Sequence, residues 1–393
     1  MKRIRPYLLL LILSLMVYLP VMEQASKSER QVDFDAHIAY ALSLPDPSSR
    51  IGHVLFHAIF LFVHRLAPNL SPSTAALIAI LMVMLPLPAM VFVLLKAAAR
   101  DTLPTAVLIA LSLALTIAAP ITVWAVRLNL GYFSSIVYHN PTSISARLFV
   151  IPLSLLAIRI FRGQPYRDLN QRVYLLLLSA SVVLLATLAK PNFIMALLPG
   201  CCLFALWRSF KRQAVDLLLL VLGFCLPGMI LMGLLYLLTF ESQNSSSTIA
   251  FGLFEVMRIW IPTWRIPLQF LLSLVFPIAV FALYFEQARQ HLYLNMCWVI
   301  FAVAAATAYS LYEDGPRISN GNFIWGGYNA IFLLMFASLL FLLEQHARER
   351  QLGCGHWIFF GRRISRRVAL ASLIFGLHII SGIAYCYRSI TQY

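Results

Sequence analysis

The sequence predicts an all-α integral membrane protein. Of its 393 residues, 61% are hydrophobic and only 11% are charged, and long apolar runs recur from end to end. A soluble domain carries about 25% charged residues, so the apolar surplus of this chain has to face lipid. The runs are continuous rather than alternating, which indicates spanning helices and excludes a β-barrel.

Eleven of these runs approach the length that crosses about 30 Å of hydrocarbon. The whole chain, 1–393, is therefore expected to be a single polytopic membrane domain of about 11 transmembrane helices, without a soluble domain. We expect these helices approximately at residues 6–21, 74–95, 103–125, 147–161, 173–189, 193–207, 214–240, 268–285, 293–311, 328–343 and 368–387.

The first run follows Lys2, Arg3 and Arg5, as in a signal peptide, but no small-residue cleavage site comes after it. We interpret this run as an uncleaved span whose N-terminus lies in the cytoplasm. The expected location is the plasma membrane, which the chain crosses many times.

The histidine-rich run 51–66 is interpreted as a helix that does not cross the membrane. With that assumption, the cytoplasmic loops hold 19 of the 30 basic and six of the 15 acidic residues, a charge of about +13 against about +2 outside. A full crossing at 51–66 would turn the later basic loops outward, which the positive-inside rule disfavours. The first outer loop, 23–73, is thus expected to contain juxtamembrane helices that lie in the interface or re-enter the membrane.

The first outer loop contains the candidate catalytic residues Asp33, Asp35 and His37. In a helix, Asp33 and His37 share one face, whereas Asp35 points about 200° away from Asp33. A carboxylate beside an imidazole near a membrane can acquire a pKa suited to proton abstraction. The alternative is a solvated helix with ordinary acidic residues, and the spacing alone leaves both interpretations open.

His53, His57 and His64 fall within about 40° of one another around a helix over 51–66. Polar groups at membrane depth usually face protein or a water-filled cavity, so this stripe is expected to line a substrate cavity; interface anchoring is the alternative. Two histidines four residues apart can bind a metal, but the glutamate of a His-Glu-x-x-His site is absent. The sequence therefore indicates no cofactor and leaves a divalent metal open.

Three later outer segments supply further candidate substrate-binding residues, namely His139 and Asn140 with Arg147, then Lys190, then Arg317. We place Arg147 at the mouth of a span, where a cation can hold a lipid phosphate; a snorkelling arginine is the alternative. Lys190 occupies a tight outer turn, contrary to the charge rule, and either binds an anion or reaches the headgroups. Arg317 belongs to a turn-rich loop that either closes over a site or is simply solvated.

Several functions are disfavoured by what the sequence lacks. It has no Walker loop, Gly-x-Ser-x-Gly motif, kinase signature or dinucleotide fingerprint in a suitable context. The cytoplasmic loops are also too short for a nucleotide-binding domain. The net charge of +15 is explained by topology, so no nucleic-acid partner is expected. The six cysteines have no paired CxxC spacing and are interpreted as buried thiols.

The organisation of the chain resembles the GT-C superfamily of membrane glycosyltransferases: one N-terminal span, a long outer loop with acidic residues near its start, juxtamembrane helices and then many spans. Four short motifs are similar to those of uncharacterised bacterial members. They are Asp33-Phe34-Asp35-Ala36-His37, His53-Val54-Leu55-Phe56-His57, His139-Asn140-Pro141-Thr142 and Ala189-Lys190-Pro191-Asn192-Phe193.

The resemblance implies a transferase that takes a sugar from a polyprenyl-phosphate donor and moves it to an acceptor on the non-cytoplasmic face, usually with inversion. The catalytic carboxyl group of the family lies in the first outer loop, which corresponds to Asp33 or Asp35 here. Large relatives add a soluble C-terminal domain that this chain lacks, so the acceptor stays unknown. The expected partners are the lipid-linked donor and membrane lipids.

Other functions remain open at this stage. A transporter or flippase of a lipid-linked or small substrate is the first alternative, although no internal repeat is found and the polar residues cluster at one face. A polymerase or ligase of surface polysaccharide would use the same donor lipid. A non-catalytic scaffold is the third alternative, but it would have no need for clustered acidic residues and histidines.

Overall fold

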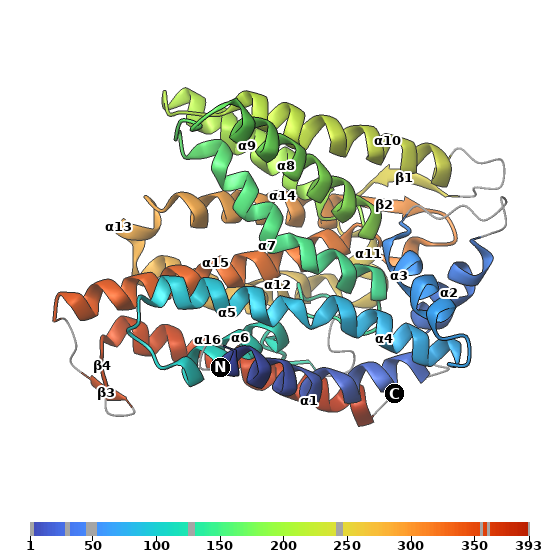
Figure 1. Cartoon of the computed structure of the whole chain (residues 1–393), viewed down its shortest axis with the longest axis horizontal. Helices are drawn as coiled ribbons and strands as arrows, with labels where there is room; N and C mark the ends of the chain where they lie inside the picture. Colours follow the sequence, from blue (N-terminus) through green and yellow to red (C-terminus); the bar gives the residue numbers. More distant parts are fainter. Residues whose placement is uncertain are drawn as a thin grey trace.

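The computed structural model describes residues 4–27, 32–44, 53–124, 130–240, 247–353, 357–359 and 362–391. Long helices lie side by side along the longest axis of the molecule (Figure 1). The elements, in chain order, are α1 (Arg5–Lys27), α2 (Val32–Ser43), α3 (Leu55–Leu66), α4 (Pro72–Met84), α5 (Pro86–Ala99), α6 (Thr105–Ile117), α7 (Pro141–Phe161), α8 (Leu169–Ala189), α9 (Ile194–Phe210), the π-helix η1 (Leu219–Cys225), α10 (Leu226–Phe240), β1 (Thr248–Phe251), α11 (Glu255–Trp260), the 3-10 helix η2 (Thr263–Arg265), α12 (Ile266–Leu283), α13 (Phe285–Ala288), α14 (Leu292–Ser310), β2 (Leu311–Asp314), the 3-10 helix η3 (Ile318–Asn320), α15 (Ile324–Gln351), β3 (Trp357–Phe359), β4 (Arg362–Ile364) and α16 (Arg366–Thr391).

Within the described residues, nine helical segments are long and apolar enough to cross a membrane. The all-α, multi-pass character predicted from the sequence is therefore confirmed. The nine segments are Arg5–Ser26, Pro72–Ala99, Pro141–Phe161, Leu169–Ala189, Leu219–Thr239, Thr263–Leu283, Leu292–Ser310, Ile318–Gln351 and Arg366–Thr391.

The count of 11 spans is not confirmed, because two of the expected spans are shorter helices. The segment expected at 103–125 forms α6, which has 13 residues, and the segment expected at 193–207 forms α9, which has 17. At 1.5 Å per residue these helices are about 20 and 26 Å long. Helix α6 ends at Ile117 because Pro120 disfavours helical geometry for the residue before it.

The run 51–66 forms α3, a helix of 12 residues and about 18 Å, too short to cross the hydrocarbon alone. It packs against α2, α4 and α7 at one end of the bundle (Figure 1). A second hydrophobic core lies there, in which Phe34 of α2 and Phe56 and Phe60 of α3 are fully buried. This core holds the two short helices in place against the longer ones.

Helix α15 is the centre of the bundle. Over its spanning window 94% of the residues are buried, and it packs against α14, α5, α12, α7 and α9. A helix that is apolar all round belongs in the core. Its first turn contains Gly326 and Gly327, where a Cβ atom would lie 2.5 Å from the Asn192 carbonyl oxygen and 2.1 Å from the Phe133 ring, respectively. Gly326 therefore lets the start of α15 approach the turn after α8 closely, and Gly327 lets it approach the segment before α7.

The two ends of the bundle differ in their elements. One end holds α2, α3 and the antiparallel pair β1–β2, in which Ile249 lies opposite Glu313. The other end holds α13 and the antiparallel pair β3–β4 (Figure 1). Since the long helices run between these ends, the outer and inner loops expected from the sequence do lie at opposite ends of the molecule.

The contact of α16 with the end of α6 depends on Gly382. A Cβ atom there would lie 1.9 Å from the carbonyl oxygen of Ile117, which is a backbone atom that cannot rotate away. We expect Gly382→Ala to destabilise the protein by about 1–3 kcal/mol, the usual cost of overpacking. Thermal unfolding of the purified protein in detergent measures the change.

Gly376 in the same helix gives the matched control. Nothing lies within 4 Å of a Cβ atom at that position. Gly376→Ala should raise stability by about 0.5–1 kcal/mol, because alanine costs less backbone entropy in a helix. Equal effects of the two substitutions would show that the α6–α16 contact does not hold as described.

Candidate functional site

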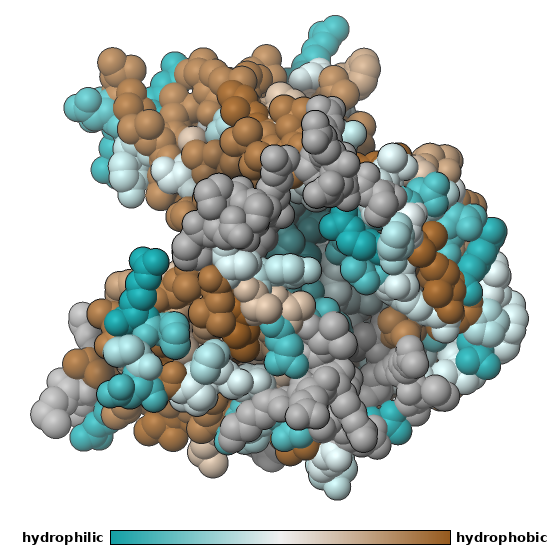
Figure 2. Space-filling model, turned by 90° about the vertical axis from the view of Figure 1, so that its right-hand side faces the viewer, coloured by the Kyte–Doolittle hydropathy of each residue, from teal (hydrophilic) through white to brown (hydrophobic). Residues whose placement is uncertain are grey.

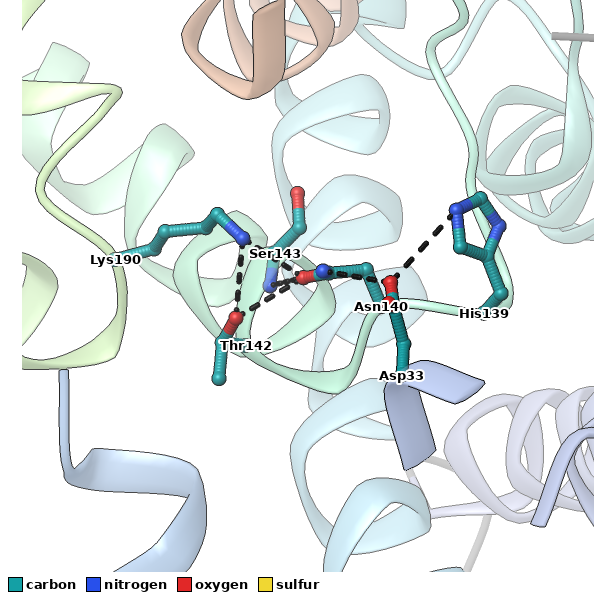
Figure 3. Close-up of polar contacts among 6 residues, drawn as sticks. All are labelled: Asp33, His139, Asn140, Thr142, Ser143 and Lys190. Carbon is teal, nitrogen blue, oxygen red and sulfur yellow. Dashed lines mark hydrogen bonds and ion pairs between the residues drawn. The ribbon is translucent and has the colours of Figure 1, made fainter. Parts of the chain in front are cut away.

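A polar cluster at the α2–α3 end joins residues from three helices and the loop before α7. The Asn140 side chain donates to Asp33 Oδ2 at 3.0 Å and accepts from Lys190 Nζ at 2.9 Å. Lys190 also donates to Thr142 Oγ1 at 3.2 Å, and His139 Nε2 lies 3.9 Å from the same Asp33 oxygen. Figure 3 shows these side chains converging on the Asn140 amide. The amide therefore bridges a carboxylate and an ammonium group.

The backbone of α7 fixes the position of Asn140. Asn140 is the N-cap, with extended dihedral angles, and its Oδ1 accepts from the Ser143 backbone N–H at 2.9 Å. Pro141 occupies the first helical position, where its missing N–H is no loss. Thr142 adds a third donor to the same oxygen at 3.0 Å. The extended backbone at Asn140 therefore aims the side-chain amide at the cluster.

Lys190 follows the last residue of α8 and is only 4% exposed. Its ammonium lies 4.7 Å from the centre of the Trp325 ring, and the edge of that ring meets His139. Burial lowers the pKa of Lys190 to about 7, against the opposing effects of Asp33 and Glu313. Because this pKa lies near neutral pH, the charge of Lys190 responds to any anion that approaches.

Phe34 separates the two acidic residues of α2. Its ring is fully buried and meets the Phe56 ring edge to face, with centroids 6.3 Å apart. With Phe34 inside, Asp33 and Asp35 project about 100° to either side of it. Asp33 reaches the polar cluster, whereas Asp35 is exposed and lies outside it. The structure thus distinguishes two residues that the sequence left equivalent.

The second polar feature is a histidine cluster formed by His37, His53 and His57. His57 Nδ1 lies 3.0 Å from the His53 carbonyl oxygen, and since a carbonyl only accepts, Nδ1 carries the proton. His57 Nε2 is then an acceptor, so His37 Nδ1, at 3.0 Å, donates to it. This order leaves His37 Nε2 unprotonated, with a lone pair available as a base.

Burial keeps this histidine pair neutral. It lowers the pKa of His37 to about 3, with the charge of Lys190 and the neighbouring His57 acting in the same direction. Burial likewise lowers the pKa of His57 to about 4, although the hydrogen bond to the His53 carbonyl raises it. Both imidazoles are therefore neutral hydrogen-bonding groups at neutral pH rather than cations.

Two of the three histidines expected to share a stripe along 51–66 lie together, since the rings of His53 and His57 are 6.2 Å apart. Helix α3 begins only at Leu55, so His53 precedes it and contributes its carbonyl oxygen to the cluster. His64 lies elsewhere, with its ring stacked on Phe60 at 5.8 Å. His37, expected beside Asp33, instead faces His57 across the α2–α3 contact. Among the described residues, no three His, Cys, Asp or Glu side chains are placed to hold a metal ion.

Arg147 is not at the mouth of a span as expected. Helix α7 starts at Pro141, so Arg147 lies almost two turns inside it and is 4% exposed. Its guanidinium stands 5.4 Å from the ring centre of Phe332 on α15. Within the described part of the chain, Nε and Nη2 of Arg147 have no hydrogen-bond partner, and the same is true of Ser143 Oγ and both amide atoms of Asn329. Polar groups without partners thus line the contact between α7 and α15.

Arg317 lies beside the polar cluster without belonging to it. Its Nε is 3.4 Å from Glu313 Oε2, and Glu313 is one of the two carboxylates that act on Lys190. Glu313 is buried where β2 pairs with β1. The loop 311–327 therefore places a carboxylate and a tryptophan against the cluster.

Sequence reasoning missed two members of the site. Trp325 was not among the candidates, but it is 8% exposed and packs on Lys190. Thr142 was only part of a motif, yet it accepts a hydrogen bond from Lys190. The Gly326-Gly327 pair directly after Trp325 is the signal that could have indicated a buried position.

In a view onto the α2–α3 end of the bundle, hydrophilic residues gather around a hollow in the surface (Figure 2).

The neutral histidine pair predicts a loss of stability in acid. Both pKa values lie below the ordinary 6.5, so between pH 6.5 and about 4 the unfolded state binds more protons than the folded state. Stability therefore falls as the pH drops, by up to about 1.4 kcal/mol per pH unit for each histidine. We expect the midpoint of thermal unfolding to fall between pH 7 and pH 5.

The double variant His37→Gln with His57→Gln tests the assignment. Its unfolding midpoint should fall less between pH 7 and pH 5 than that of the unmodified protein, whatever its value at pH 7. Measurements at pH 7 and pH 8, where both histidines are neutral in either state, give the baseline. An identical fall in acid for both proteins would contradict the buried neutral pair.

Comparisons of the chain with protein-family models, with curated proteins and with solved structures found no match. The site is described by its own geometry: a carboxylate anchored by an amide, a buried lysine on the same amide, and a neutral histidine pair nearby. All three features lie at one end of a bundle of apolar helices. They are the basis of the functional proposal that follows.

Proposed function

We propose that this protein is a membrane glycosyltransferase that moves a sugar from a polyprenyl-phosphate donor to an acceptor at the non-cytoplasmic face. The observation that carries the proposal is the Asp33–Asn140–Lys190 bridge, which holds a carboxylate and a buried cation on one amide. The first outer loop is also where the resemblance to the GT-C superfamily expects the catalytic carboxylate.

The chemistry needs one base and one group that stabilises negative charge. Asp33 accepts the proton of the acceptor hydroxyl while that oxygen forms a bond to the anomeric carbon. The bond from the anomeric carbon to the phosphate oxygen breaks, and the electron pair leaves with the polyprenyl phosphate. Lys190 in its protonated form stabilises the departing phosphate. The donor is already activated, so no cytoplasmic energy source is required.

Arg147 supports a lipid-linked substrate over a soluble one. A buried guanidinium with unpaired nitrogen atoms lies between α7 and α15, beside other polar atoms without partners. Leaving such groups unsatisfied inside a membrane protein is costly, so they usually belong to a substrate path. A phosphate has the charge and the acceptor oxygens that would satisfy these groups.

The charge distribution supports an orientation with the polar cluster outside the cytoplasm. The end that holds α13, β3 and β4 also holds the basic loops after α7, α9, α12 and α15. Positively charged loops stay in the cytoplasm. In this orientation the N-terminus is cytoplasmic, and Asp33 faces the side on which polyprenyl-linked sugars are used by the enzymes that this chain resembles.

A transporter of a lipid-linked substrate is the second candidate. The unpaired atoms of Ser143, Arg147 and Asn329 lie within spanning helices, as the polar groups of a substrate path would. A transporter has no need for a general base at the surface end. The two functions therefore differ in their dependence on Asp33.

The matched pair Asp33→Asn and Asp35→Asn tests the proposal. Asparagine keeps the size of the side chain but cannot act as a base, so Asp33→Asn should lower the rate of sugar transfer by about 10²–10⁴-fold. Asp35→Asn should stay within a few-fold of the unmodified protein, since Asp35 is exposed and outside the cluster. The assay uses the protein in lipid nanodiscs with radiolabelled polyprenyl-phosphate sugars and measures sugar moved to acceptors in added membrane extract.

Comparable activity in both variants would remove Asp33 as the base. Movement of donor lipid across vesicle membranes without any sugar transfer, and equally fast in Asp33→Asn, would favour the transporter instead. Expression and thermal unfolding of both variants show whether the fold is intact.

The orientation has its own test by cysteine labelling in a variant whose native cysteines are replaced. Arg167 and Asn320 are both exposed, but they lie at opposite ends of the bundle. In intact cells an impermeant thiol reagent should label Asn320→Cys and leave Arg167→Cys unlabelled until the membrane is opened. Labelling of Arg167→Cys alone would reverse the orientation and place Asp33 in the cytoplasm.

A further inference from the structure

A second hollow lies far from the polar cluster. It is a cavity of about 690 Å³ between α9, α12, α13 and α14, open to the outside. Its volume falls within the roughly 300–1,000 Å³ that is typical of ligand sites. The walls are mostly apolar and aromatic, from Leu203, Phe204, Trp207, Phe281, Phe285 and Trp298. We call this cavity the aromatic groove.

The aromatic groove belongs to the basic end of the bundle. Helix α9 begins at Ile194, shortly after Lys190, and its groove-lining residues Leu203, Phe204 and Trp207 lie about 14–20 Å along the helix from that start. Helix α13 and the start of α14 close the groove at the same end (Figure 1). The groove is thus separate from the candidate catalytic site and independent of the function proposed for it.

The mouth of the groove carries an excess of positive charge. Arg289 lines the groove, and the ammonium of Lys211 lies 5.4 Å from the ring centre of Trp207, another lining residue. Glu286 pairs with Arg289 at 2.6 Å, but both side chains are more than half exposed, and such pairs are weak. Asn295 also lines the groove, and its side-chain amide nitrogen donates to the backbone carbonyl groups of Ala288 and His291.

We propose that the aromatic groove binds an anionic membrane phospholipid, with an acyl chain between the aromatic walls and the phosphate at Arg289 and Lys211. The walls suit a hydrocarbon chain, and apart from the indole N–H of Trp298, which has no partner among the described residues, they offer few hydrogen bonds to a polar ligand. The basic residues at the mouth suit an anionic headgroup, because each lysine or arginine near a membrane surface favours acidic lipids. A zwitterionic lipid would gain the chain contacts alone.

The test is native mass spectrometry of the purified protein in detergent, titrated with phosphatidylglycerol or with phosphatidylcholine of the same chains. The unmodified protein should bind one phosphatidylglycerol about tenfold more tightly than phosphatidylcholine. Ala282→Phe fills the groove from an exposed lining position and should weaken phosphatidylglycerol binding by about tenfold. Leu373→Phe, on the exposed face of α16, is the matched control and should not change it.

A charge variant, Lys211→Gln with Arg289→Gln, separates the headgroup from the chain. It should bind both lipids with the affinity that the unmodified protein has for phosphatidylcholine. Wild-type binding of phosphatidylglycerol by Ala282→Phe, or an undiminished preference in the charge variant, would overturn the proposal. So would a second copy of the chain occupying the groove, seen as a dimer that Ala282→Phe dissociates.

A direct measurement covers the case in which Ala282→Phe fails to fold. Phosphatidylglycerol with bromine-labelled chains quenches the emission of nearby tryptophan. Quenching of the unmodified protein should exceed that of the variant Trp207→Phe with Trp298→Phe, and unlabelled phosphatidylglycerol should compete it away. Equal quenching of the two proteins would place the bound lipid elsewhere and refute the site.

Discussion

The amide of Asn140 is the constraint on which the polar end of the molecule depends. A buried ammonium costs several kcal/mol unless its hydrogen bonds are satisfied, and Lys190 finds its acceptors in Asn140 and Thr142. The opposite end of the same amide donates to Asp33, so two groups of opposite charge are held apart at fixed positions. A direct ion pair would neutralise both groups, whereas the bridge leaves the Asp33 carboxylate partly exposed.

Composition and hydrophobic run length were enough to predict the class of fold and the approximate place of most spans. They could not predict where helices end, because the ends depend on single residues. Pro120 shortens α6, and the Asn140-Pro141 cap starts α7 earlier than the apolar run does. Because α7 starts six residues earlier than expected, Arg147 is buried within the helix and does not lie at the membrane surface. A small shift of a helix boundary thus changed the environment of a functional candidate.

The candidate site was predictable as a set of residues but not as a set of contacts. A helical wheel relates residues within one helix, so it grouped Asp33 with His37 and His53 with His57. The actual partners are 107 residues apart for Asp33 with Asn140, and 20 apart for His37 with His57. Helix packing brings them together, and packing follows from the buried Phe34 and Phe56 rather than from the polar residues themselves. Polar spacing alone therefore cannot select the partner.

Burial controls the charge of this site. His37 and His57 are neutral at neutral pH and the pKa of Lys190 is lowered to about 7, because desolvation disfavours every positive form. If all three were charged, they would repel one another at close range. A phosphate that enters the site opposes this effect of desolvation, since a nearby negative charge favours the protonated form of Lys190. In the transfer proposed above, the departing phosphate would meet a cation whose charge its own arrival has stabilised.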